Sequence, residues 1–181
     1  LASALSPGDL LVLEGDLGAG KTALVQFIAR ALGVPRDQPV TSPTFEIVHE
    51  FRGREPIIHA DLYRLDPSEP LEELGLLERI GRDAIVLIEW GVRFEDQLGA
   101  TGVVLQLALC AASERRCVLT ARDNRGTLVV QRLIPLLYAG GALLLAMSVP
   151  RLASGFLPGL VSSISINSAI GIYSSVASGM L

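Results

Sequence analysis

The sequence predicts an α/β fold in which helices cover both faces of a mostly parallel β-sheet. Two unbroken apolar runs, at residues 10–13 and 84–88, are typical of strands that are buried on both faces of such a sheet. A glycine-rich segment at residues 15–22 follows the first run, and apolar residues then recur at spacings of three and four along residues 23–32. Strand, glycine loop and helix in this order predict a three-layer fold that binds nucleotide phosphates.

The glycine-rich segment reads GDLGAGKT, which satisfies the phosphate-loop pattern GxxxxGK[ST] at every specified position. Its glycines allow turns in which successive N–H groups point at phosphate oxygens, and the following helix adds the positive end of its dipole. We expect Lys21 to reach the β- and γ-phosphates and the Thr22 hydroxyl to bind Mg²⁺. The predicted nucleotide-binding residues are Gly15, Asp16, Gly18, Ala19, Gly20, Lys21, Thr22 and Ala23.

Four further strands and a short helix are predicted around this unit. Residues 45–51 and 57–62 form strands that are separated by a polar turn. Residues 69–75 are rich in glutamate and form a short helix with a solvated face. Residues 102–108 and 115–121 alternate well enough to form two antiparallel edge strands.

Hydroxyl and carboxyl groups follow the first helix and the third strand. In the loop VTSPTF, either Ser42 or Thr44 could sense the γ-phosphate or its Mg²⁺, and an ordinary Ser-Pro turn is an equally good explanation. Strand alternation places Asp61 on the same face as His59. Asp61 could hold Mg²⁺ through water or orient the attacking water, although a strand-end aspartate taken alone is more often a turn residue.

The second buried strand ends at a glutamate. In open α/β sheets ligands bind beyond the carboxyl ends of the strands, so Glu89 is aimed at the same edge as the glycine loop. It is therefore a candidate for the acid beside Mg²⁺ or for the base that positions water, and an exposed strand-end glutamate is the alternative. Trp90 either stacks near the site or covers the core. Arg115 or Arg116 could approach a nucleotide, and surface charges are the more ordinary interpretation.

Charge divides the chain near Gly126. All 19 acidic residues and 13 of the 15 basic residues precede this point, so residues 1–126 carry 13 minus 19, a net charge of −6. Residues 127–181 carry only Arg132 and Arg151. We therefore predict a phosphate-loop domain at 1–126, truncated at its N-terminus because the chain starts without methionine, and an apolar tail at 127–181. An acidic domain is a poor direct partner for nucleic acid, so any RNA connection would run through another protein.

The tail and the cysteines give weaker signals. Residues 133–150 carry no charge and would reach about 27 Å as a helix, just short of a hydrocarbon core of roughly 30 Å. Membrane contact is thus one interpretation of the tail, and an extra packing element or a non-native extension are the others. Cys110 and Cys117 form no metal or disulfide pattern, and their apolar surroundings predict buried free thiols.

Five ordered motifs make the chain resemble the TsaE (YjeE) family. These are GDLGAGKT, SPTF, HADLYRL, LGLLE and IEW, and the resemblance covers about residues 6–121. It implies the ATPase component of bacterial tRNA threonylcarbamoyladenosine biosynthesis, with ATP and Mg²⁺ bound at Lys21 and Thr22. It also implies that Thr44 belongs to a switch-like loop, that Asp61 is needed for turnover, and that Glu89 is the metal-side acid. The catalytic set implied is Lys21, Thr44, Asp61 and Glu89, and Thr22 and Glu89 are the metal-side residues.

The same resemblance implies partners. TsaB and TsaD homologues would form an assembly that ATP hydrolysis resets, with tRNA contacted only through the complex. The chain departs from the family pattern at its start, where an N-terminal strand and helix that help form the base pocket are largely absent, at Ala23, and after residue 126.

Together these observations predict a cytoplasmic P-loop NTPase-type protein that slowly hydrolyses MgATP. One alternative is a small-molecule kinase on the same fold, which would need an acceptor pocket and an arginine-bearing lid. Another is a nucleotide-dependent binding switch without useful turnover. Phosphate transfer to a metabolite would identify the kinase, and single-turnover hydrolysis would separate the ATPase from the switch.

Overall fold

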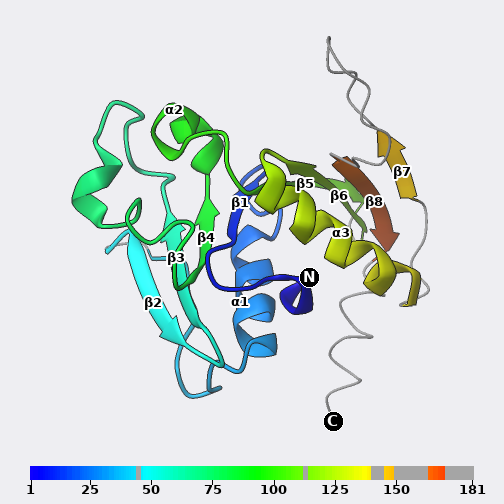
Figure 1. The fold of residues 1–181 in the computed structure, drawn as a ribbon, viewed down its shortest axis with the longest axis horizontal. Coiled ribbons are helices and arrows are strands. Elements are labelled where there is room, and N and C mark those ends of the chain that lie inside the picture. The colour runs from blue at the N-terminus through cyan, green and yellow to red at the C-terminus, as the bar shows by residue number, and fades with distance from the viewer. Residues whose placement is uncertain (44–45, 112–113, 140–144, 149–162, 170–181) are drawn as a thin grey trace.

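The structure is a computed structural model that describes residues 1–43, 46–111, 114–139, 145–148 and 163–169. The described strands form one sheet in the order β2-β3-β4-β1-β5-β6-β8-β7 (Figure 1). They are β1 Leu10–Glu14, β2 Val48–Arg52, β3 Pro56–Asp61, β4 Ile85–Glu89, β5 Val103–Ala111, β6 Glu114–Ala121, β7 Leu145–Ser148 and β8 Ser163–Ala169. The α-helices are α1 Lys21–Ala31, α2 Glu95–Leu98 and α3 Asn124–Ala139, and the 3-10 helices are η1 Ala2–Ala4, η2 Leu71–Leu74 and η3 Gly91–Phe94.

The centre of the sheet is parallel and its flanks are antiparallel. β1 pairs in parallel with β4 and with β5, and β4 pairs in parallel with β3. β2 is antiparallel to β3, and β6 is antiparallel to both β5 and β8. The predicted mostly parallel α/β sheet is therefore confirmed where the two fully apolar runs, β1 and β4, lie side by side.

Three predicted elements differ in detail. The antiparallel pair expected at 102–108 and 115–121 is present, but β5 also pairs with β1 and β6 with β8, so neither strand lies at an edge. The strand expected at 45–51 begins only at Val48, because Ile47 has a φ of 62° and a left-handed residue interrupts an extended chain. The short helix expected at 69–75 is a single 3-10 turn, η2.

Each face of the sheet has its own apolar core. Alternate strand residues such as Leu11, Leu13 and Leu87 pack against α1 and α3, which lie on the same face (Figure 1). The intervening residues, such as Val12 and Ile88, pack against the segment that carries η2, η3 and α2. This alternation follows from the two-residue period of a strand and produces the three layers that the sequence predicts.

Helix α3 runs across the predicted division near Gly126. Its residues Val129, Val130 and Leu133 are buried in the same core as α1. The buried carboxylate of Asp9, just before β1, accepts hydrogen bonds from Arg125 Nε at 2.9 Å and Arg132 Nη2 at 3.4 Å. The charge drop after residue 126 thus falls within a helix that is anchored to the sheet.

Among the described residues, no helix is both long and apolar enough to cross a membrane. The uncharged run at 133–150 contains the end of α3 and strand β7. Residues 140–144 and 149–150 of that run lie outside the described residues.

The two cysteines differ in exposure, so the prediction of two buried thiols is wrong for Cys110, which is exposed.

Burial raises the pKa of the Cys117 thiol to about 11. At pH 8 about one Cys117 thiol in 10³ is then a thiolate, the reactive form. We expect a disulfide reagent such as Ellman's to titrate one thiol per folded chain quickly and the second only after unfolding. In Cys110→Ser the fast phase should disappear; a fast phase that persists would contradict this assignment.

Candidate nucleotide-binding site

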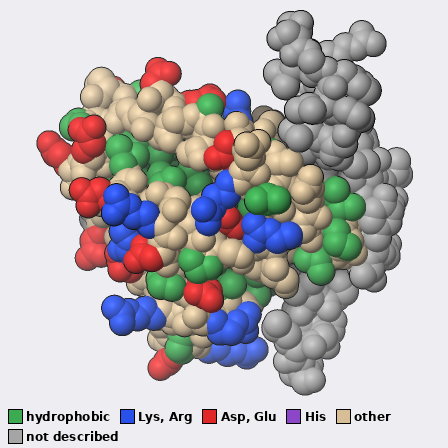
Figure 2. Space-filling view, viewed as in Figure 1, with side chains coloured by type: hydrophobic (Ala, Val, Ile, Leu, Met, Phe, Trp, Pro, Cys, Tyr) green, Lys and Arg blue, Asp and Glu red, His purple; other side chains and the backbone are tan. Residues whose placement is uncertain are grey.

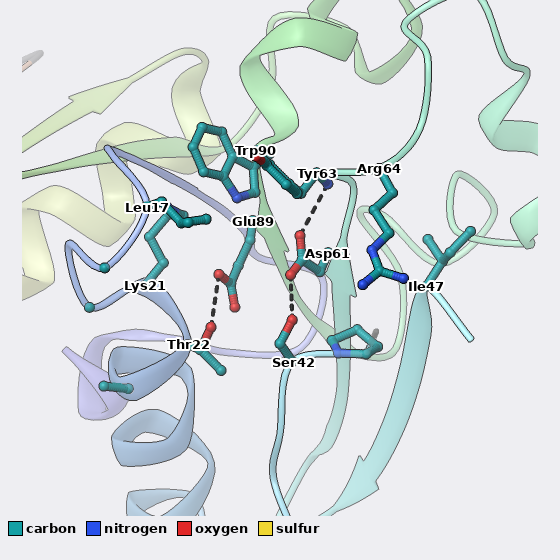
Figure 3. A pocket seen from close by; sticks show the side chains of 14 residues that line it. Leu17, Lys21, Thr22, Ser42, Ile47, Asp61, Tyr63, Arg64, Glu89 and Trp90 are labelled. Carbon is teal, nitrogen blue, oxygen red and sulfur yellow. Dashed lines mark hydrogen bonds between the residues drawn. The ribbon is translucent and has the colours of Figure 1, made fainter. Parts of the chain in front are cut away.

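A cavity of about 450 Å³ lies at the edge where β1, β3 and β4 end and α1 begins (Figure 3). This is the edge at which open α/β sheets bind ligands. Seven of the predicted site residues line it, from the glycine-rich segment and the start of α1, from the end of β3 and from the end of β4. They are Gly18, Gly20, Lys21, Thr22, Ala23, Asp61 and Glu89. The lining residues are Leu17, Gly18, Gly20, Lys21, Thr22, Ala23, Ser42, Pro43, Ile47, Asp61, Tyr63, Arg64, Glu89 and Trp90.

The phosphate loop joins β1 to α1 and leaves the N-terminus of α1 open. Gly20, the residue before the helix, is left-handed with a φ of 107° and provides no side-chain cap. A Cβ built on Gly18 or Gly20 would meet no atom within 4 Å, so the loop borders open space on this side. Helix N–H groups that lack a cap and face a cavity suit an anion such as phosphate.

The Lys21 side chain is held over the loop by hydrogen bonds to the loop backbone. Its Nζ donates hydrogen bonds to the carbonyl oxygens of Gly15 at 2.6 Å and Asp16 at 3.0 Å. It also lies 3.8 Å from the centroid of the Trp90 ring. Burial lowers the pKa of Lys21, and the nearby carboxylates, Glu89 foremost, oppose that shift. A bound polyanion would likewise favour the charged ammonium.

Glu89 lies at the end of β4 and contacts two other elements. Its Oε2 accepts a hydrogen bond from the Thr22 hydroxyl at 3.1 Å, and its Oε1 lies 2.9 Å from His59 Nε2. Glu89 is 2% exposed, so the alternative of an exposed strand-end glutamate is wrong. The two predicted metal-side residues, Thr22 and Glu89, are therefore in direct contact although 67 positions separate them.

Asp61 points into the cavity from the end of β3 (Figure 3). The Ser42 hydroxyl donates a hydrogen bond to its Oδ2, and the Tyr63 amide donates one to its Oδ1 at 3.1 Å. The loop hydroxyl beside Asp61 is thus Ser42, one of the two that the sequence offered. Thr44, the other, lies outside the described residues.

Aromatic side chains form one wall of the cavity. Trp90 is left-handed with a φ of 63°, which turns its ring over Lys21, and its ring centroid lies 5.0 Å from that of Tyr63. The sequence left Trp90 undecided between a site and a core position, and the structure places it at the site. Tyr63 also lines the cavity, although its sequence context did not predict it as a site residue. The signal that could have found it is its position two residues after Asp61.

The oxygen donors in the cavity fit a magnesium ion that is also coordinated by a phosphate. Among the described residues, no group of three or more His, Cys, Asp or Glu side chains could hold a metal. The Thr22 hydroxyl and the Glu89 carboxylate are hard oxygen donors, and Mg²⁺ is commonly held by one or two protein oxygens together with phosphates and water. The ion would therefore depend on the nucleotide for much of its coordination.

Arg115 reaches the phosphate loop from the β5–β6 hairpin. Its Nε donates a hydrogen bond to the carbonyl oxygen of Ala19 at 3.1 Å. The sequence favoured a surface position for this arginine, and the structure shows that it contacts the loop backbone. It is not among the residues that line the cavity.

Replacement of Gly15 by alanine should destabilise the fold and distort the loop. Gly15 has a φ of 136°, and a Cβ there would lie 2.1 Å from the Leu107 carbonyl oxygen. Strain and overpacking together should lower the free energy of unfolding by about 3 kcal/mol or more. Gly81→Ala is the matched control, because Gly81 is also left-handed but its Cβ would meet no atom. Equal urea midpoints for the two variants would contradict the predicted clash.

Comparison with known proteins agrees with the geometry. The family model for "Threonylcarbamoyl adenosine biosynthesis protein TsaE" matches residues 1–118. The chain belongs to the TsaE family. A TsaE protein named for tRNA threonylcarbamoyladenosine biosynthesis in Bacillus subtilis (strain 168) is 38% identical over 133 residues, 73% of this chain and 82% of that protein. The protein of the same name from Nostoc sp. (strain PCC 7120) is 45% identical over 100 residues, 51% of this chain and 59% of that protein.

A solved structure supports the fold. The crystal structure of Bacillus subtilis YdiB matches with a TM-score of 0.61 at 31% identity, over 75% of this chain and 83% of that chain. The predicted P-loop NTPase-type fold and the resemblance to the TsaE family are both confirmed. The TsaE family match ends within β6, so α3 lies beyond it, yet α3 packs into the same core.

Proposed function

We propose that this chain binds MgATP and hydrolyses it as the ATPase component of tRNA threonylcarbamoyladenosine biosynthesis. The observation that carries the proposal is the convergence of Lys21, Thr22, Asp61 and Glu89 on one cavity beside an uncapped helix N-terminus. The family assignment supplies the biological context, since the relatives are named for that biosynthesis.

Each group has a separate role in the proposed reaction. The loop amides and the Lys21 ammonium hold the phosphates, Lys21 exchanging the carbonyls of Gly15 and Asp16 for phosphate oxygens. Thr22 and Glu89 would hold Mg²⁺, and the bound ion would supply positive charge beside the phosphates. Asp61, fixed through both of its oxygens, orients water for in-line attack on the γ-phosphate. By family resemblance Thr44 completes this catalytic set.

The partners proposed are TsaB and TsaD homologues in the cytoplasm, with tRNA contacted only through that assembly. Charge supports the indirect contact, because the chain carries a formal net charge of −4. On the face shown in Figure 2, acidic and basic side chains of the described residues are interspersed rather than gathered into one basic area. Such a surface offers little attraction for a phosphate backbone.

The proposal is tested by phosphate release from ATP by the full chain, with and without TsaB and TsaD. We expect slow release that depends on Mg²⁺ and rises when both partners are added. Tight MgATP binding without release under any condition would overturn the hydrolytic mechanism and leave a nucleotide switch. Transfer of the γ-phosphate to a small molecule, with little inorganic phosphate formed, would indicate the kinase instead.

A further inference from the structure

A buried histidine lies directly behind the carboxylate of Glu89. His59 is 0% exposed and does not line the cavity, and its Nε2 lies 2.9 Å from Glu89 Oε1. The other oxygen of the carboxylate, Oε2, accepts the Thr22 hydroxyl. The carboxylate is therefore held from both sides, on one side by a residue that faces the cavity and on the other by one that does not.

The geometry decides which ring nitrogen carries the proton. An ionised carboxylate only accepts hydrogen bonds, so His59 Nε2 must be the N–H donor. Nδ1 is buried and has no hydrogen-bond partner among the described residues. In a neutral ring the proton then belongs on Nε2. If it were on Nδ1 instead, that buried N–H would have no acceptor and Glu89 Oε1 would lose its donor.

We propose that His59 is a positioning residue, which fixes the Glu89 carboxylate so that Oε2 faces Thr22 and the metal side of the cavity. This inference rests on the proposed function. It adds a specific interaction, the Nε2–H···Oε1 hydrogen bond, behind the groups that face the nucleotide. Groups that orient a metal ligand from behind typically change metal affinity or activity by about 10–100-fold when they are removed.

Strand register explains why position 59 can do this. β3 and β4 are parallel, with Asp61 opposite Glu89 and His59 opposite Leu87. Side chains two residues apart share a face, so His59 lies one step behind Glu89 on the adjacent strand. An apolar side chain could fill the same space but would leave Oε1 of a buried carboxylate without a donor, which is costly.

The first test measures the tautomer of the native His59 ring and therefore needs no substitution at position 59. The chain has two histidines, and ¹⁵N-imidazole spectra of His49→Gln contain signals from His59 alone. We expect the Nε2–H tautomer. Observation of the Nδ1–H tautomer would overturn the proposal, because the ring could not then donate to Glu89.

The second test compares His59→Gln, which can present an N–H at a similar reach, with His59→Asn, which is too short to do so. ADP binding is measured with EDTA and with MgCl₂, and ATP hydrolysis is resolved into kcat and KM. In His59→Asn we expect ADP affinity in EDTA to be unchanged, its enhancement by Mg²⁺ to be reduced, and kcat to fall about 10–100-fold. His59→Gln should retain most of the enhancement of ADP affinity by Mg²⁺ and most of the wild-type kcat. His49→Asn, in the paired position on β2 and outside the cavity, is the matched control.

The outcomes separate this proposal from the proposed function. If the wild type hydrolyses MgATP and His59→Asn does so equally well, only the positioning role is wrong. If His59→Asn loses ADP affinity equally in EDTA and in Mg²⁺, or if His59→Gln is as impaired as His59→Asn, the ring serves packing rather than hydrogen bonding and the proposal fails. If the wild type binds no nucleotide at all, the proposed function fails and the positioning role fails with it.

Discussion

Replacement of Lys21 by alanine should abolish measurable ATP hydrolysis, with a loss of about 10²–10³-fold or more in kcat/KM. Lys21 is 5% exposed at the floor of the cavity, and its ammonium already bonds the loop carbonyls that border the predicted phosphate position. Removal of this positive charge takes away the side chain that we expect to stabilise charge on the transferring phosphoryl group. Phosphate release and MgATP affinity should both fall, as measured by a coupled assay and by calorimetry.

Folding should not be the cause of that loss. Burial lowers the pKa of Lys21, which means that the charged ammonium is less stable in the folded protein than in water. Its removal is therefore not expected to lower the thermal midpoint greatly. Arg36→Ala is the matched control, because it removes one positive charge from an exposed position outside the cavity. Retention of MgATP binding and turnover by Lys21→Ala would show that the phosphates bind elsewhere.

The phosphate loop could be predicted from the sequence because all of its determinants are contiguous. Glycine positions, Lys21 and Thr22 lie within one segment between a strand and a helix, so spacing alone conveys the geometry. The rule that ligands bind at the carboxyl ends of parallel strands also allowed Glu89 to be predicted at this edge of the sheet. The contact between Glu89 and Thr22 depends on β4 being next to β1, and the order of strands in a sheet cannot be predicted from the spacing of nearby residues.

The features that the sequence did not reveal depend on distant pairs or on an unusual backbone conformation. Alternation placed His59 on the face of Asp61, but only the β3–β4 register brings its ring to Glu89. Trp90 covers Lys21 because a left-handed backbone turns it there, and tryptophan is not a residue for which that conformation is expected. The charge drop near residue 126 suggested a boundary, whereas Asp9 binds arginines on both sides of it.

Replacement of Glu89 by glutamine should separate binding from hydrolysis. Glutamine keeps the shape of the side chain and can still accept the Thr22 hydroxyl, but it removes the negative charge that a metal ion needs. Charge stabilisation by a metal is worth several kcal/mol in such reactions, so kcat should fall about 10²-fold or more, since each 1.4 kcal/mol is tenfold. Metal-free ADP binding should persist, because Lys21 and the loop amides are intact. Calorimetry in EDTA and phosphate release in MgCl₂ measure the two quantities.

The comparison of Glu89→Gln with Lys21→Ala distinguishes the two halves of the proposed site. If Lys21 binds phosphate and Glu89 serves the metal, Lys21→Ala weakens ADP with or without Mg²⁺, whereas Glu89→Gln removes only the enhancement by Mg²⁺. Glu78→Gln, at an exposed position outside the cavity, controls for the loss of one carboxylate. Equal loss of metal-free ADP binding in both site variants would mean that Glu89 organises the loop itself. Its contacts to Thr22 and His59 would then be structural, and the metal would have to be held by other oxygens.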